Sequence, residues 1–218
     1  MPRKFKKSKV SICVFCEGES EQAYIDFLKS EFHDVAVFKR PSPPGLFDDA
    51  DNRFKKDPGY RNYVDAIDEI WFFFDVEEKD IGNWTNRLDI IKRLRKLRKD
   101  PKIRVRLLMT TGCIEYWLML HYRQLAPPLL TVPDKERMLA QVVRVEPTYR
   151  KGNYDATARI AQNYPTAVKN ATIVLQNLLQ EGMPGLEDTD ERNRWLCTKC
   201  KTFSTVQEAI IFLESLQS

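Results

Sequence analysis

Short apolar runs and helical patterns alternate through the first half of the chain. The apolar runs are rich in β-branched and aromatic residues, as buried strands are, and the most apolar of them reads IWFFF. Strands are predicted over residues 10–15, 34–38, 70–74 and 103–109. Helices are predicted over residues 21–31, 60–68, 85–99 and 113–122. Strands that alternate with helices in this order predict an α/β fold with βαβ units and a mainly parallel central sheet.

Beyond Pro127 the pattern changes, and the remaining apolar segments have the period of a helix. Helices are predicted over residues 134–143, 156–162, 166–179 and 205–216. We therefore expect an α/β core over residues 1–125 and a helical C-terminal region over residues 126–218. That region either packs on the sheet or forms a lid.

The composition is that of a folded protein with a sizeable core. Of the 218 residues, 43% are hydrophobic and 30% are charged, and the net charge of +4 means that any basic surface must be local. The five cysteines are odd in number, which favours reduced thiols. The apolar run near the start is too short for a signal-peptide core, and no stretch is long enough to cross a membrane. We expect a cytoplasmic protein with no membrane partner.

Carboxylates follow two of the predicted strands. Glu17 comes after the first strand, and Asp75 and Glu77 come after the strand at residues 70–74. Ligands of parallel α/β sheets bind beyond the carboxyl ends of the strands, and extended residues two apart point the same way. Crowded carboxylates repel unless a cation neutralises them, and their hard oxygens suit Mg²⁺ or Mn²⁺. The alternative is that they are helix caps or part of a solvated loop.

Basic residues gather at one predicted helix and the strand that follows it. Candidate contacts to a nucleic-acid backbone are Arg93, Lys96, Lys99 and Arg104. A solvated amphipathic helix would show the same pattern. The basic segment at residues 1–9 is a second candidate for binding nucleic acid.

The cysteine spacing and the nucleotide-binding motifs bear on two other kinds of site. Cys197 and Cys200 have the spacing of half a zinc knuckle, but a zinc site normally needs four ligands, and Cys13 and Cys16 fall on opposite faces of a strand. Neither a Walker A motif nor a GxGxxG motif is present, so ATP hydrolysis by this chain is not expected.

Several motifs resemble those of the RloB-like family, in the same order along the chain. The first, at residues 17–21, reads EGESE and resembles the family's E-G-E-x-T-E element. Phe74-Asp75-Val76-Glu77 stands where a Toprim domain has D-x-D, and residues 111–122 resemble S-N-P-x-F-E-x-W-L-L-L-H-F. Weaker matches are Tyr149-Arg150-Lys151-Gly152 for the family's Y-x-K, residues 167–171, and residues 203–206 for N-P-x-T-x-V.

The resemblance implies a Toprim-like Rossmannoid fold with an acidic Mg²⁺ or Mn²⁺ site. Glu17 would be a metal ligand or general acid/base, Asp75 and Glu77 would hold metal, and Lys151 would stabilise phosphate charge. Glu115 is a further candidate site residue, at the first turn of a helix where a carboxylate is favoured anyway. His121 could equally be a core residue. Departures from the family are Glu77 in place of Asp, Thr111-Gly112 in place of Asn-Pro, and Ile114 in place of Phe.

The leading hypothesis is a metal-dependent nuclease of DNA or RNA, with tRNA among the candidates, that serves anti-phage defence. The alternative is a non-catalytic nucleic-acid-binding or regulatory subunit with the same fold. The resemblance also implies a separate ATPase as partner, and a homo-oligomer is left open. Glu77 at the D-x-D position favours the alternative, because its side chain is longer than that of the expected Asp and would change the geometry of metal coordination.

Overall fold

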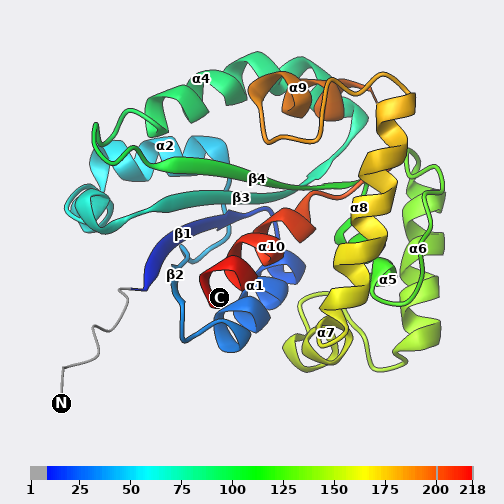
Figure 1. Cartoon of the computed structure of the whole chain (residues 1–218). Coiled ribbons are helices and arrows are strands. Elements are labelled where there is room, and N and C mark those ends of the chain that lie inside the picture. Colours follow the sequence, from blue (N-terminus) through cyan, green and yellow to red (C-terminus); the bar gives the residue numbers. More distant parts are fainter. Residues whose placement is uncertain (1–8, 200, 218) are drawn as a thin grey trace.

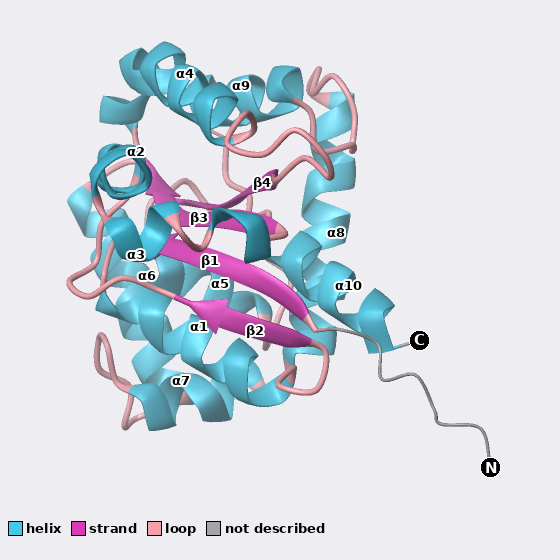
Figure 2. Cartoon of the chain, turned by 90° about the vertical axis from the view of Figure 1, so that its left-hand side faces the viewer, coloured by secondary structure: helices cyan, strands magenta, loops and turns pink. Residues whose placement is uncertain are grey.

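Four parallel strands form the centre of the molecule. The structure is a computed structural model that describes residues 9–199 and 201–217, except for the side chains of residues 79 and 80. The strands are β1 (Val10–Cys16), β2 (Ala36–Lys39), β3 (Glu69–Val76) and β4 (Arg104–Thr111). They lie side by side in the order β2-β1-β3-β4, as Figure 2 shows, and every pair is parallel. The predicted α/β fold with a parallel sheet is confirmed.

Helices cover both faces of this sheet, so the fold has three layers (Figure 1). On one face lie α2 (Phe47–Lys56), α4 (Trp84–Leu94) and α9 (Asp190–Thr198). On the other lie α1 (Glu19–Glu31), α5 (Ile114–Leu120) and α10 (Val206–Gln217). Alternate strand residues supply the two cores: Trp71 and Phe73 point to α1, and Phe72 and Phe74 point to α2. Both faces are buried, which is why the strands read as continuous apolar runs.

The C-terminal helices pack directly on this layered core. They are α6 (Val132–Val145), α7 (Tyr154–Ala161) and α8 (Tyr164–Gln180), followed by α9 and α10. Helix α8 supplies Ala167 and Ala171 to one core cluster and Val174 and Leu175 to the other. The whole region is therefore anchored to both faces of the sheet. The boundary at residue 125 stays a prediction.

The segment before α10 extends the edge of the sheet at β4. Ser204 pairs with Thr110 in an antiparallel bridge, and Thr205 N–H donates to the Met109 carbonyl at 2.9 Å. The Thr205 hydroxyl also donates to the Leu107 carbonyl and accepts from the Met109 N–H, both at 2.8 Å. This threonine is the one in the predicted N-P-x-T-x-V match, so its role here is to fasten α10 to the edge strand.

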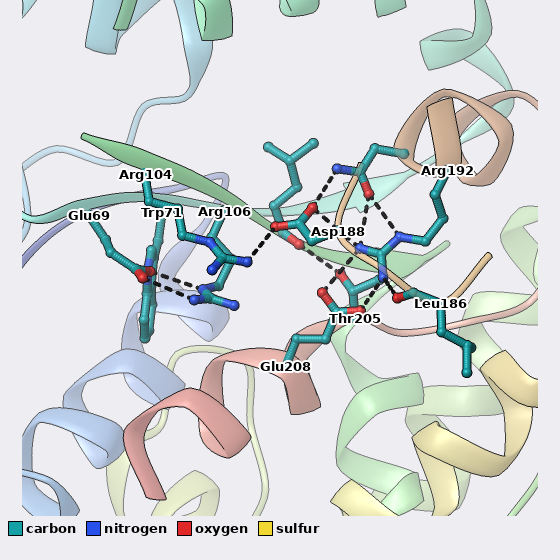
Figure 3. Close-up of polar contacts among 11 residues, drawn as sticks. Glu69, Trp71, Arg104, Arg106, Leu186, Asp188, Arg192, Thr205 and Glu208 are labelled. Carbon is teal, nitrogen blue, oxygen red and sulfur yellow. Dashed lines mark hydrogen bonds and ion pairs between the residues drawn. The ribbon is translucent and has the colours of Figure 1, made fainter. Parts of the chain in front are cut away.

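Two arginines are buried in this part of the fold, and each is paired with carboxylates (Figure 3). Arg106 makes two hydrogen bonds of 3.0 Å to Glu69, which also accepts from Trp71 Nε1 at 2.6 Å. Arg192 lies between Asp188 at 3.4 Å and Glu208 at 2.5 Å. Buried charges need such partners, and these join α9, α10 and the sheet.

Several predicted elements were wrong. The helix at residues 60–68 is replaced by two short turns, α3 (Pro58–Arg61) and a 3-10 turn at Val64–Ala66. Helices α2 and α9 were not predicted, and a 3-10 segment, η2 (Glu78–Asn83), precedes α4, which ends at Leu94 and not at Lys99. The basic segment at residues 1–8 and Cys200 lie outside the described residues. Cys13 and Cys16 do fall on opposite faces of β1, in different core clusters.

Candidate functional site

The site lies where the strand order reverses. From β1 the chain passes to β2 on one side and then crosses to β3 on the other, so the carboxyl ends of β1 and β3 flank the switch point of the sheet. Ligands of open α/β sheets bind in this crevice. Glu17 follows β1, and its N–H donates to the Phe73 carbonyl at 3.0 Å. Its Oε2 accepts from the Asp75 N–H at 3.1 Å, so the two predicted residues are in contact.

Two helices bring further carboxylates to the same place. Glu21, in the first turn of α1, is 4% exposed, and Glu115, in the first turn of α5, is 1% exposed. The positive end of each helix dipole favours a carboxylate at these positions. Glu17, Glu21, Asp75 and Glu115 together line one cavity of about 310 Å³, which we call the carboxylate cavity.

The carboxylates in this cavity repel one another. Burial, and then the charges of Glu21, Glu17 and Glu115, hold the pKa of Asp75 well above its ordinary value. Burial also raises the pKa of Glu21 to about 7, with Glu17 and Glu115 adding to the shift. Oδ1 of Asp75 is buried and has no hydrogen-bond partner among the described residues. A bound proton or a bound cation would therefore relieve the repulsion between these carboxylates.

A divalent cation fits this donor set. The donors in the cavity are hard carboxylate oxygens, and the buried Asp75 Oδ1, which has no hydrogen-bond partner among the described residues, is available to a cation. Among the described residues, no three acidic, histidine or cysteine side chains converge into a ready cage. Mg²⁺ does not need one, because it keeps several waters and is held by one or two carboxylates. Asp75 and Glu17 are the residues placed to hold it.

Glu77 is directed to another partner. Its carboxylate accepts a hydrogen bond from Lys135 Nζ in α6, and Glu77 is absent from the lining of the carboxylate cavity. The lysine charge reaches Asp75 as well, where it lowers the pKa. Of the predicted metal ligands, the structure thus brings Glu17 and Asp75 together and does not bring Glu77 to them. Its role as a metal ligand stays a prediction.

The loop between α6 and α7 supplies the basic group of the cavity. Tyr149 is buried and donates from its hydroxyl to Glu115 Oε1 at 3.1 Å. Lys151 lies at the rim, 66% exposed, with Nζ 3.9 Å from the same oxygen. Gly152 has φ +75°, and its N–H donates to Ser20 Oγ at 3.1 Å. A Cβ there would lie 3.0 Å from Glu19 Oε2, so glycine lets the loop approach α1 closely.

The entry into α5 depends on Gly112. Its φ is +75°, and a Cβ would lie 2.6 Å from the Leu129 carbonyl oxygen. Proline is fixed near −65° and cannot adopt this conformation. Thr111-Gly112 in place of Asn-Pro therefore also means a different backbone conformation at the start of α5. It leaves Glu115 facing the cavity.

His121 belongs to the core. It is fully buried, its Nε2 lies 3.1 Å from the Tyr24 hydroxyl, and its Nδ1 lies 3.0 Å from the Trp117 carbonyl. Burial lowers its pKa to about 4, so the ring is neutral at physiological pH. It does not line the carboxylate cavity.

Of the predicted basic residues, Arg104 lies at the amino ends of the strands, and the carboxylate cavity lies at their carboxyl ends. Arg104 begins β4 opposite Glu69, whereas Asp75 and the cavity are at the carboxyl end, about 20 Å along the strands. Arg93 makes a bidentate pair with Asp51, and Arg104 pairs with Asp188 at 3.5 Å. Their role in binding nucleic acid stays a prediction, and such binding would occur away from the cavity.

Two functional residues were missed from the sequence. Glu21 was part of the EGESE match but was not assigned a role, although its place in the first turn of α1 after a strand-end carboxylate was a usable signal. Lys135 is 58 residues from Glu77, and nothing in the local sequence indicates that they meet.

The family comparison agrees with the motifs that form this site. The family model described as "RloB-like protein" matches residues 12–210. The chain belongs to the RloB-like family. The match covers most of β1, the other three strands, α1, α5 and the Lys151 loop, so all members of the carboxylate cavity lie within it. Neither the curated proteins nor the solved structures gave a match to this RloB-like chain. Among its described residues, none of the helices is long and apolar enough to span a membrane.

Proposed function

We propose that this RloB-like protein is a metal-dependent nuclease that cleaves phosphodiester bonds in DNA or RNA at the carboxylate cavity, in defence against phage. The observation that carries the proposal is the buried, unpartnered Asp75 oxygen in a cavity lined by five carboxylates, the exposed Glu19 included, with a lysine at its rim. Membership of the family supports a nucleic-acid role in defence. A phosphodiester is the substrate that a Mg²⁺-type site and an adjacent lysine serve together.

Each residue has a defined part in this proposal. Asp75 and Glu17 would hold Mg²⁺ or Mn²⁺, which supplies Lewis-acid polarisation of the phosphoryl oxygen and an activated water. Glu17 is the exposed carboxylate of this pair, and it already accepts a hydrogen bond from the Asp75 N–H. It would accept a proton from the attacking water. Glu115 is oriented by the Tyr149 hydroxyl and in turn faces the Lys151 ammonium.

Two lysines flank the cavity. Lys151 is at the rim on one side, where its exposed ammonium can donate to a non-bridging phosphate oxygen. Lys135 reaches from α6 on the other side, paired with Glu77. Their charges balance the phosphate that the carboxylates alone would repel. Lys135 therefore adds to the basic group predicted from sequence.

The test compares cleavage with metal binding. Purified protein is incubated with labelled DNA and with tRNA in Mg²⁺ or Mn²⁺, beside the Asp75→Asn and Glu17→Gln variants. Loss of cleavage in both variants, with thermal stability in EDTA no lower than that of the wild type, supports the site. Cleavage that survives both substitutions refutes it. Glu31→Gln is the matched control, because Glu31 is exposed on the same helix and lies outside the lining of the carboxylate cavity.

A non-catalytic nucleic-acid-binding or regulatory subunit is the second candidate. It is favoured by the pairing of Glu77 with Lys135. In this pairing the second acidic residue of the motif is directed to a lysine and is therefore not offered to a metal. Binding of nucleic acid in every metal without cleavage would support it, provided that Mn²⁺ produces no heat of binding. A partner ATPase, if required, would appear as cleavage restored by the other proteins of the same locus.

A further inference from the structure

A second hollow lies beside the carboxylate cavity, along α1. It consists of two adjoining cavities of about 590 and 310 Å³ that share Asp26, Lys29 and Arg40. Tyr154, at the start of α7, completes the larger one, and Lys39, at the end of β2, completes the smaller. We call the whole the α1 hollow. None of these residues was assigned a role in the proposed cleavage.

The charges in the α1 hollow leave one cation available to a ligand. Arg40 makes a bidentate pair with Asp26, at 3.1 and 2.8 Å. Lys39 donates to the Gly59 carbonyl at 3.0 Å and stacks over aromatic rings. Lys29 is exposed and forms no ion pair with any residue in the described ranges. Lys29 is thus the side chain that can pair with an anion in the hollow, and the Arg40–Asp26 pair lies beside it.

The aromatic member of the hollow is also presented to solvent. Tyr154 is 41% exposed, although aromatic side chains elsewhere in this fold are mostly buried. A solvent-facing aromatic ring next to a lysine is the combination that binds single-stranded nucleic acid, because a base stacks on the ring while the lysine meets a phosphate. A double helix does not offer its base faces, so the ring favours an unpaired strand.

Two segments connect the α1 hollow with the carboxylate cavity. Helix α1 supplies Glu19–Glu21 to the cavity and Asp26, Lys29 and Ser30 to the hollow, and residues 151–154 supply Lys151 to the first and Tyr154 to the second. From residue 20 to residue 29 the helix rises about 14 Å, which matches roughly four stacked nucleotides at ~3.4 Å each. The two sites therefore share α1 and residues 151–154 in their walls, and we call the two sites together the track.

We propose that the α1 hollow binds the nucleic-acid strand on one side of the phosphate in the carboxylate cavity, with a base on Tyr154 and a phosphate on Lys29. The proposal rests on the proposed function, since it takes the cavity as the reaction site. It also places the strand at the carboxyl ends of the sheet strands, away from Arg104 at their amino ends.

The test measures binding in EDTA, so that it is independent of cleavage. Fluorescence anisotropy with labelled single strands of about 12 nucleotides, DNA and RNA, compares the variants with the wild type. We expect Tyr154→Ala to weaken binding about fivefold or more and Tyr154→Trp to restore it. Lys29→Ala should lower the slope of log K against log salt by about 0.7.

Matched controls separate this track from other surfaces. Tyr122 has the same exposed fraction, 41%, and lies outside both hollows, so Tyr122→Ala should bind as the wild type does. Lys96→Ala tests the basic residues predicted from sequence. The proposal is overturned if Tyr154→Ala and Tyr122→Ala bind equally well, if Lys96 carries the salt dependence, or if the wild type does not bind at about 100 µM.

The outcomes distinguish this proposal from the proposed function. Asp75→Asn should fail to cleave, and adding Tyr154→Ala to it should still weaken binding of the strands. Normal cleavage with no effect of Tyr154→Ala on binding overturns the track and leaves the nuclease standing. Binding that depends on Tyr154, with no cleavage in any metal, leaves the track standing and overturns the nuclease.

Discussion

Replacement of Glu21 by glutamine should stabilise the metal-free protein at high pH. Glu21 is buried, and burial together with Glu17 and Glu115 raises its pKa from 4.5 to about 7. Between these values the folded chain holds a proton that the unfolded chain releases, so the contribution of Glu21 to stability falls as the pH rises through this window. At about 1.4 kcal/mol per pKa unit, the cost at pH 8 is on the order of 3 kcal/mol.

The assay is urea unfolding in EDTA at about pH 5 and pH 8. Glutamine keeps the shape of the side chain and removes its charge, so Glu21→Gln should gain roughly 1–3 kcal/mol at pH 8 and little at pH 5. Glu31→Gln, at an exposed position at the other end of the same helix and outside the cavity, should change neither. An equal effect of Glu21→Gln at the two pH values would refute the reasoning, because it would mean that the side chain has no raised pKa in the fold.

Three other substitutions have definite expected effects. Gly112→Ala should lower the free energy of unfolding by roughly 2 kcal/mol or more, measured in urea, because its φ is positive and Leu129 blocks a Cβ; a change under about 0.5 kcal/mol would contradict this. Arg106→Ala should cost about 3–5 kcal/mol by leaving Glu69 buried and unpaired, an effect that a second substitution of that glutamate to glutamine should largely relieve. Lys151→Ala should reduce cleavage about 10²-fold with unchanged Mn²⁺ binding, and equal loss of both would contradict a role toward phosphate.

The sequence predicted the sheet well because the strands are buried on both faces. Continuous apolar runs such as Ile70–Phe74 need no partner to be recognised, and the carboxylates at their ends follow from where ligands bind in parallel sheets. Glu17 and Asp75 were found in this way, and the structure brings them into contact. The motif matches added Glu115 and Lys151, which meet at the same cavity.

The elements that were missed lack a local signal of burial. Helix α9 reads DERNRWLCT, and its buried residues include the charged Arg192, whose partner Glu208 lies in α10. Helix α2 has only three buried residues, Phe47, Ala50 and Phe54, among charged ones. Such helices form because tertiary contacts select them, and these contacts are not encoded at neighbouring positions.

The position of Glu77 shows the limit of local geometry. Alternation along an extended chain places Asp75 and Glu77 on one face, and this was the basis for predicting both as metal ligands. The strand ends at Val76, however, and α6 offers Lys135 as a partner for Glu77. A helix that begins 56 residues after β3 ends thus supplies the partner of Glu77.

The most direct test of the central claim is calorimetric titration of Mn²⁺ into the metal-free protein at about pH 8, above the pKa of about 7 that burial gives Glu21. The account predicts saturable binding that Asp75→Asn abolishes and Glu77→Gln retains, since Asp75 lines the carboxylate cavity and Glu77 pairs with Lys135. The same isotherm for the wild type and Asp75→Asn would contradict a metal site at this cavity.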